Sequence, residues 1–139
     1  MPKNFIKRFP VNIPYEDIRR EARFQRHAAA MGLSPKVIRC TNKTIVMEQI
    51  KGKCLADKYG DNIEDIPEWV KEDILDILST LYTTAGIEYV DITPYNFIEV
   101  DGIVWIIDFG HARHASKTKD CFLEEILDNW ELKWNPDFA

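Results

Sequence analysis

The stretch YVDITPYNFIEVDGIVWIIDFG, from Tyr89 to Gly110, decides the fold of this chain. Two short apolar segments in it flank an Asp-Gly pair, which is a strong signal for a tight β-hairpin. Four residues separate Asp91 from Asn96, and eleven separate Asn96 from Asp108. A tight loop before the hairpin would therefore bring these three polar side chains to one end of it.

The three polar side chains suit a divalent cation that also binds phosphate. Asn96 and Asp108 offer oxygen atoms, which are the ligands that Mg²⁺ takes from proteins. Asp91, set slightly apart, can accept a proton from an incoming hydroxyl. Gly110 lets the backbone turn sharply behind Asp108. A plainer alternative is that Asp91 and Asn96 are turn residues whose side chains cap nearby backbone groups.

Short strands and helices alternate along the rest of the chain. The pattern predicts strands at 4–9, 36–41 and 43–50, the hairpin at 97–100 and 103–107, and helices at 15–31, near Leu55, at 67–84 and at 120–132. Glu21 lies near the edge of the apolar face of the first helix. This order predicts an α+β chain of two small lobes, residues 1–51 and 52–139, with a linker near Gly52.

Charge and composition narrow the possible partners. The 139 residues carry a net charge of −5, which disfavours non-specific binding to nucleic acid phosphates. Arg19, Arg23 and Arg26 form a stripe at helical spacing, either a solvated face or a surface for a phosphate-bearing partner. His111 and His114 lie three residues apart, but no cysteine or acidic residue lies at a spacing that would complete a metal site, so we expect them in a solvated loop. No apolar run suits a membrane span, and three widely spaced cysteines fit a reducing cytoplasm.

The segment from Asp91 to Asn96, followed by Asp108-Phe109-Gly110, resembles the catalytic loop and metal-binding motif of the protein-kinase-like superfamily. In style it is most similar to RIO-like and aminoglycoside-phosphotransferase-like kinases. The resemblance implies a minimal kinase fold, with an N-lobe of about three strands plus one helix and a reduced, mainly helical C-lobe. It also implies transfer of the γ-phosphoryl group of Mg-ATP to a hydroxyl of a protein or small molecule.

The same resemblance implies roles for residues of the first lobe. Lys7 would hold the nucleotide phosphates with Glu21 as its ion-pair partner, Met47 would lie behind adenine, and Glu48 and Ile50 would offer it backbone groups. Asp91 would be the catalytic base, and Asn96 and Asp108 the metal ligands. From the residues alone, Lys7 could instead extend to solvent, and Glu21 could pair with an arginine of its own helix.

Three departures from the kinase pattern qualify the expectation. No Gly-rich loop precedes Lys7, Tyr89-Val90 replaces the usual His-Arg pair, and no Ala-Pro-Glu segment follows Gly110. Nucleotide affinity should then be low, and Tyr89 either hydrogen-bonds in the catalytic loop or simply packs there. The alternative function is a weak or inactive kinase mimic that binds proteins, and homo-oligomerisation could cover the missing parts.

Overall fold

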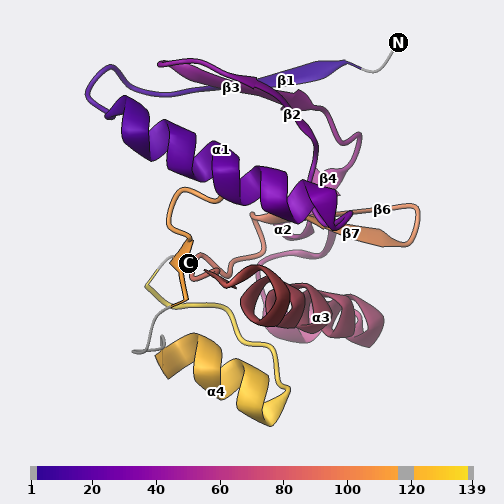
Figure 1. The fold of residues 1–139 in the computed structure, drawn as a ribbon. Coiled ribbons are helices and arrows are strands. Elements are labelled where there is room, and N and C mark those ends of the chain that lie inside the picture. Colours follow the sequence, from indigo (N-terminus) through magenta and orange to yellow (C-terminus); the bar gives the residue numbers. More distant parts are fainter. Residues whose placement is uncertain (1–2, 116–120, 138–139) are drawn as a thin grey trace.

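The computed structural model describes residues 3–115 and 121–137 and has an α+β fold, drawn in Figure 1. Its elements are β1 (Asn4–Arg8), α1 (Tyr15–Ala30), β2 (Val37–Cys40), β3 (Thr44–Glu48), β4 (Lys53–Cys54), α2 (Leu55–Tyr59), the 3₁₀ turn η1 (Ile63–Asp65), α3 (Glu68–Ala85), β5 (Ile87–Glu88), β6 (Phe97–Val100), β7 (Ile103–Ile106), β8 (Arg113–His114) and α4 (Cys121–Asn129). The predicted α+β class is confirmed. The two-residue strands and the 3₁₀ turn were not expected, and the predicted start of the last helix at Asp120 lies outside the described residues.

The N-terminal sheet is antiparallel, with strand order β1-β3-β2. Lys7 of β1 pairs with Ile45 of β3, and Phe5 pairs with Met47. Figure 1 shows α1 crossing beneath this sheet. Ile18 and Ala22 of α1 form a small buried cluster with Ile45 and Met47, so one face of the helix fixes the side of the sheet that faces inward.

The predicted hairpin is confirmed, with β6 and β7 paired and β4 added on the other side of β6. Its turn has positive φ at both central residues, 53° at Asp101 and 77° at Gly102, as a two-residue hairpin turn requires. The loop after α1 is tied to β7, because Ile106 N–H donates to Leu33 O at 2.9 Å and Ser34 Oγ donates to Ile106 O at 2.7 Å. These bonds hold the N-terminal sheet and α1 over the hairpin.

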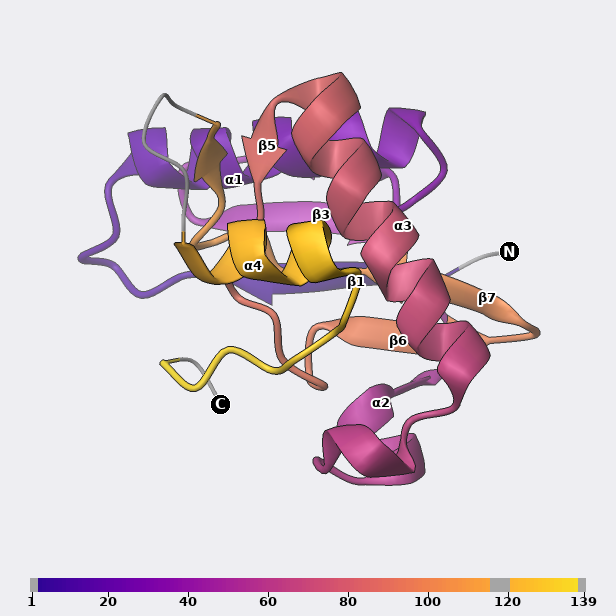
Figure 2. The same ribbon diagram turned by 90° about the horizontal axis from the view of Figure 1, so that it is seen from below.

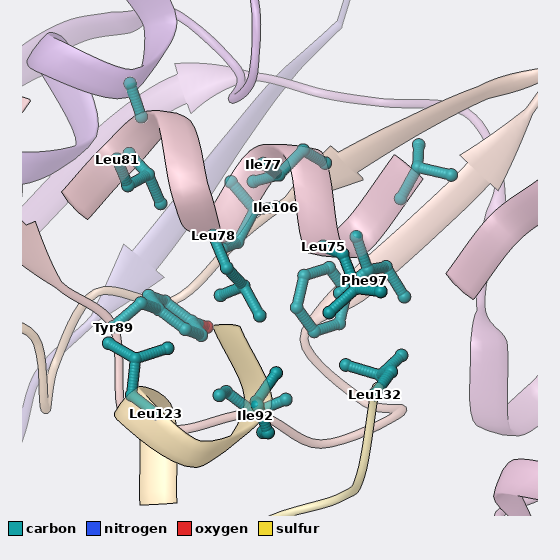
Figure 3. Packing of buried hydrophobic residues seen from close by; sticks show 14 of the residues in the cluster. Leu75, Ile77, Leu78, Leu81, Tyr89, Ile92, Phe97, Ile106, Leu123 and Leu132 are labelled. Atoms are coloured by element: carbon teal, nitrogen blue, oxygen red, sulfur yellow. The ribbon is translucent and has the colours of Figure 1, made fainter. Parts of the chain in front are cut away.

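The main core lies around α3, which Figure 2 shows lying beside α4 on the side away from the N-terminal sheet. Buried side chains of the hairpin, the 89–92 loop and α4 pack against α3 there, as Figure 3 shows. The labelled members are Leu75, Ile77, Leu78, Leu81, Tyr89, Ile92, Phe97, Ile106, Leu123 and Leu132. Phe24 and Ala28 of α1 join the same cluster, so α1 contributes to both cores. In the described ranges, no helix is both long enough and apolar enough to cross a bilayer.

We propose that the boundary between the two lobes lies near Gly52. All strands of the N-terminal sheet and α1 lie between residues 4 and 48. The next strand, β4, pairs with β6 through Lys53 opposite Glu99, so it belongs with the hairpin. A Cβ on Gly52 would lie 3.0 Å from Ile98 Cγ2, so the connection runs close against the hairpin.

Candidate functional site

A cavity of about 400 Å³ lies between the N-terminal sheet and the hairpin. Its lining comes from both parts of the fold: Phe5, Lys7, Glu21, Gln25, Pro35, Met47, Glu48, Gln49, Ile50, Gly52, Ile98, Ile107 and Asp108. Apolar side chains line most of it, and the charged groups are Lys7, Glu21, Glu48 and Asp108. The predicted residues Lys7, Glu21, Met47, Glu48, Ile50 and Asp108 therefore share one cavity.

Lys7 forms two ion pairs at one end of the cavity. Its ammonium donates to Glu21 Oε2 at 2.5 Å and to Asp108 Oδ1 at 3.2 Å. Burial alone would lower the pKa of Lys7, but the carboxylates of Asp108 and Glu21 outweigh it and the pKa is raised. Lys7 therefore stays positively charged. It points to the two carboxylates rather than freely into solvent, and Glu21 pairs with Lys7 rather than with an arginine of α1.

Glu21 is only 5% exposed on α1, although the sequence placed it near the edge of the buried face. Burial raises the pKa of Glu21, the charge of Lys7 acts against this, and the nearby Asp108 carboxylate adds to the rise. The end of the cavity thus holds two carboxylates around one ammonium. Such a cluster favours one more cation, which would offset the excess negative charge.

Asp108 has a left-handed backbone, with φ of 63°, which is uncommon for a residue with a side chain. Gly110 N–H donates to its Oδ1 at 3.1 Å, so the carboxylate is held by its own loop as well as by Lys7. A Cβ on Gly110 would lie 3.2 Å from both Asp108 Oδ1 and Glu21 Oε1. The two carboxylates therefore approach the Gly110 backbone so closely that a side chain here would have to push them aside.

Tyr89 supports the backbone of Asp108 from the core. Its hydroxyl lies 2.6 Å from Ile107 O and 2.8 Å from Asp108 O, to which it donates, and its ring packs edge-on against Phe109. Burial raises the pKa of Tyr89 well above 10, and the charges of Asp108, Asp91 and Glu21 add to this. Tyr89 therefore does more than pack, but its hydrogen bonds go to the strand end at Ile107 and Asp108 rather than to the catalytic loop.

The loop that carries Asp91 and Asn96 is buried and held from several sides. Asn96 Nδ2 donates to Asp91 O at 2.9 Å, and Ile107 N–H donates to Asn96 O at 2.9 Å. Asn135, beyond α4, donates through Nδ2 to Val90 O at 2.8 Å. Asn96 does bind its own loop, as the turn alternative expects, but this bond uses only Nδ2 and leaves Oδ1 for another partner.

Asp91 and Asn96 lie beside the cavity rather than in its lining, and each is 8% exposed. The backbone bonds from Tyr89 and to Asn96 place their loop next to Asp108. An arrangement of one exposed carboxylate and one amide oxygen suits Mg²⁺ only together with water and phosphate oxygens. The described ranges contain no cluster of three or more His, Cys, Asp or Glu residues that could hold a metal ion.

Two residues near the site were missed by the sequence reasoning. His111 Nδ1 lies 3.2 Å from Asp91 Oδ2, so the residue after Asp108-Phe109-Gly110 contacts the proposed base. Its position directly after that motif was the only signal. Gln25 Nε2 donates to Pro35 O at 2.9 Å and to Met47 Sδ at 3.3 Å, which shapes the wall behind Met47. His114 instead packs edge-on against Phe24.

Several curated proteins are similar to this chain. A probable serine/threonine-protein kinase RIO1 homolog of Encephalitozoon cuniculi is 32% identical over 82 residues, covering 57% of this chain and 21% of that protein. The EKC/KEOPS complex subunit BUD32 of the same organism is 33% identical over 103 residues, covering 73% and 50%. A probable bifunctional tRNA threonylcarbamoyladenosine biosynthesis protein of Methanospirillum hungatei is 35% identical over 102 residues, covering 73% and 18%. The chain thus spans half or less of the length of these relatives.

A solved structure shows the same fold. The complex of Rv3197 with erythromycin from Mycobacterium tuberculosis superposes with a TM-score of 0.59 at 24% identity, covering 76% of this chain and 28% of that one. The family model of the RIO domain matches residues 7–128, which include Lys7, Glu21, Asp91, Asn96 and Asp108. Because this match spans most of the chain, the protein belongs to the RIO domain family of the protein-kinase-like superfamily.

Proposed function

We propose that this chain is an ATP-dependent phosphotransferase that moves the γ-phosphoryl group of Mg-ATP to a hydroxyl group. The observation that carries the proposal is the cavity, which is apolar along most of its wall and ends at Lys7, Glu21 and Asp108. A purine needs flat apolar walls, and a triphosphate needs an ammonium and a bound cation. The RIO1 and BUD32 relatives support kinase-like use of ATP.

The adenine would lie between Met47 and the apolar side chains of the hairpin. Met47 and Ile50 line one side of the cavity, and Ile98 and Ile107 line the other. The end of β3 runs past this opening, so backbone groups of Glu48 and Ile50 are the candidates for hydrogen bonds to the base. Gln25 would keep the Met47 side chain in place through its contact with Sδ.

The phosphates would lie at the charged end of the cavity. Lys7 would bind phosphate oxygens, and Glu21 would hold its ammonium in position. Mg²⁺, bound through Asn96 Oδ1 and Asp108, would neutralise charge on the phosphates, and the residues fit it because two carboxylates face one ammonium here. Asp108 is the more open ligand, with 40% of its side chain exposed.

Asp91 would accept the proton of the acceptor hydroxyl as its oxygen bonds to the γ-phosphorus and the bond to the leaving oxygen of ADP breaks. His111 contacts Asp91 Oδ2 and would orient this carboxylate. Catalysis would come mainly from positioning and charge neutralisation, as in other phosphoryl transfers.

The acceptor and any protein partner lie beyond the shared site. The name of the BUD32 relative assigns it to the EKC/KEOPS complex. By analogy, we propose that this chain also works with a protein partner, which could supply contacts to the acceptor. Ile6 on β1 and Val11 in the connection between β1 and α1 are exposed apolar side chains outside the cavity lining, and a partner could cover them.

The second candidate is a nucleotide-binding protein module that transfers no phosphate. The contact between His111 and Asp91 favours it, because the ring occupies one oxygen of the carboxylate that would have to meet the acceptor. This module would still bind Mg-ATP, so turnover and binding must be measured separately.

The decisive experiment measures binding and transfer on the same preparations. Calorimetry would give Mg-ATP affinity, and radiolabelled γ-phosphate would be followed onto the chain itself, a generic protein and a panel of small hydroxyl compounds. Asp108→Ala should lower the rate of transfer by roughly 10²-fold or more. Lys7→Ala should weaken Mg-ATP binding, because the phosphates lose their ammonium partner. The matched control is Asp76→Ala, which changes an exposed carboxylate of α3 away from the cavity.

Each outcome selects between the candidates. Transfer lost in Asp108→Ala and Asp91→Asn but kept in Asp76→Ala supports the phosphotransferase. Mg-ATP binding without transfer to any acceptor supports the non-catalytic module. Unchanged transfer in Asp108→Ala would refute the proposed mechanism.

A further inference from the structure

A second, basic hollow lies on the outer side of α1, away from the nucleotide cavity. It has a volume of about 190 Å³ and is lined by Tyr15, Arg19, Arg23, Arg26 and Cys40. The first four recur every three or four residues along α1, so they share one face of the helix, and Cys40 belongs to the adjoining strand β2. None of these residues lines the nucleotide cavity.

The arginines of this basic hollow form no ion pair with a carboxylate in the part of the chain that the structure describes. Arg19 lies over the Tyr15 ring at 5.6 Å, and within the described ranges Arg23 and Arg26 have no ion pair. By contrast, Arg20 on the next face of α1 pairs with Asp17 at 3.6 Å. Three guanidinium groups around one depression are the arrangement that binds a phosphate dianion, because each fork can donate two parallel hydrogen bonds.

The strand beside the hollow has a free edge. In the sheet order β1-β3-β2, β2 has β3 as its only strand neighbour among the described residues. Ile38 on β2 is 46% exposed, and Cys40 at the end of β2 forms part of the hollow. An open strand edge can add an extended peptide through backbone hydrogen bonds, with alternate side chains placed in adjoining pockets.

We propose that this basic hollow and the edge of β2 together bind a peptide segment that carries a phosphorylated serine or threonine. The phosphate would lie among Arg19, Arg23 and Arg26, and the peptide backbone would run along β2. The overall charge of −5 opposes a long polyanion such as RNA, whereas one phosphate in a small depression responds mainly to the adjacent arginines. The binding site does not depend on the proposed function of the nucleotide cavity.

The test uses the whole chain and a peptide library in which random residues flank a central phosphoserine or phosphothreonine. Binding would be measured by fluorescence anisotropy against the unphosphorylated library, inorganic phosphate and a single-stranded RNA oligonucleotide, with excess Mg-ATP present to fill the cavity. We expect the phosphorylated library to bind and to shift the amide resonances of 37–40. Arg23→Ala combined with Arg26→Ala should weaken binding at least about tenfold.

The matched control is Arg20→Ala, an exposed arginine of the same helix that does not line the hollow. It should bind as the wild type does, and all variants should keep wild-type melting curves because alanine is a good helix former. Any of three results would overturn the proposal: no binding, equal binding of inorganic phosphate alone, or tighter binding of RNA.

Discussion

Tyr89→Phe removes a single oxygen atom from the support of Asp108. The ring of Tyr89 is 1% exposed and packs edge-on against Phe97 and Phe109, with centroid distances of 6.2 and 5.4 Å. Phenylalanine keeps these contacts, so the substitution isolates the hydroxyl group. What is lost is the hydrogen bond to the carbonyl oxygens of Ile107 and Asp108.

The expected loss of stability is about 1–3 kcal/mol. A hydrogen bond contributes roughly 1 kcal/mol net, and a buried carbonyl left without its donor raises the loss to about 3 kcal/mol. The hydroxyl has one hydrogen to share between two acceptors, so the estimate is not doubled. For a chain of this length, the melting temperature should fall by roughly 4 °C for each kcal/mol.

Urea denaturation followed by far-UV circular dichroism would measure this loss, with Tyr95→Phe as the matched control. Tyr95 is 54% exposed, so its hydroxyl should contribute less than about 0.5 kcal/mol. Mg-ATP affinity should also fall in Tyr89→Phe, because Asp108 loses its support. Equal stability of the two variants would refute the view that this hydroxyl holds the strand end that carries Asp108.

The raised pKa of Tyr89 predicts how stability changes at alkaline pH. A group whose pKa is raised by folding contributes stability that is present below its usual pKa, here 10, and lost as the pH rises above it. The free energy of unfolding of the wild-type protein should therefore fall more steeply above this pH than that of Tyr89→Phe. The difference between the two is the contribution of the Tyr89 hydroxyl. If the free energies of unfolding of the two proteins fell equally above pH 10, the raised pKa of Tyr89 would be contradicted.

Two further predictions concern buried carboxylates. Because burial raises the pKa of Glu21, its contribution to stability is present below the usual pKa of 4.5 and lost as the pH rises. Glu21→Gln should therefore lose less melting temperature than wild type between pH 4 and pH 7, while its Mg-ATP affinity falls about tenfold because Lys7 loses a charged partner. Thermal melting and calorimetry test this, and equal pH dependence of the two proteins would contradict it. Hydrogen bonds from Lys58 and the adjacent tyrosine lower the pKa of Glu99, whose contribution is present above 4.5 and lost as the pH falls through the lowered value. The urea midpoint of unfolding should therefore fall less at acid pH in Glu99→Gln than in the wild type. Glu64→Gln, which changes an exposed carboxylate, should show the wild-type pH dependence.

Much of the local structure follows from the sequence alone. The Asp101-Gly102 turn and the apolar segments beside it predict the hairpin, because a two-residue turn with positive φ at both positions needs these residue types. The closeness of Asp91, Asn96 and Asp108 in space likewise requires only one loop and one hairpin. Short-range geometry of this kind leaves few alternatives, so it can be read from the order of residues.

The resemblance to kinases implied the pair of Lys7 with Glu21, but residue patterns alone gave no other contact between distant segments. The sequence placed Glu21 near an edge, yet the packing of α1 between two cores makes it almost fully buried. The contact of His111 with Asp91 depends on how the chain leaves Gly110, and no periodic pattern encodes it. The choice for Tyr89 between hydrogen bonding and packing also required the position of the strand end at Ile107.

The sequence by itself determined that a hairpin would carry an amide and two carboxylates at its base, since the spacing of a few residues and the chemistry of one turn suffice for that. Only the tertiary structure decided that Lys7 meets Asp108, which lies 101 residues further along the chain. That meeting depends on α1 packing beneath the N-terminal sheet and on the bonds from 33–34 to Ile106. Long-range distances result from the sum of many packing contacts, and no local pattern specifies that sum.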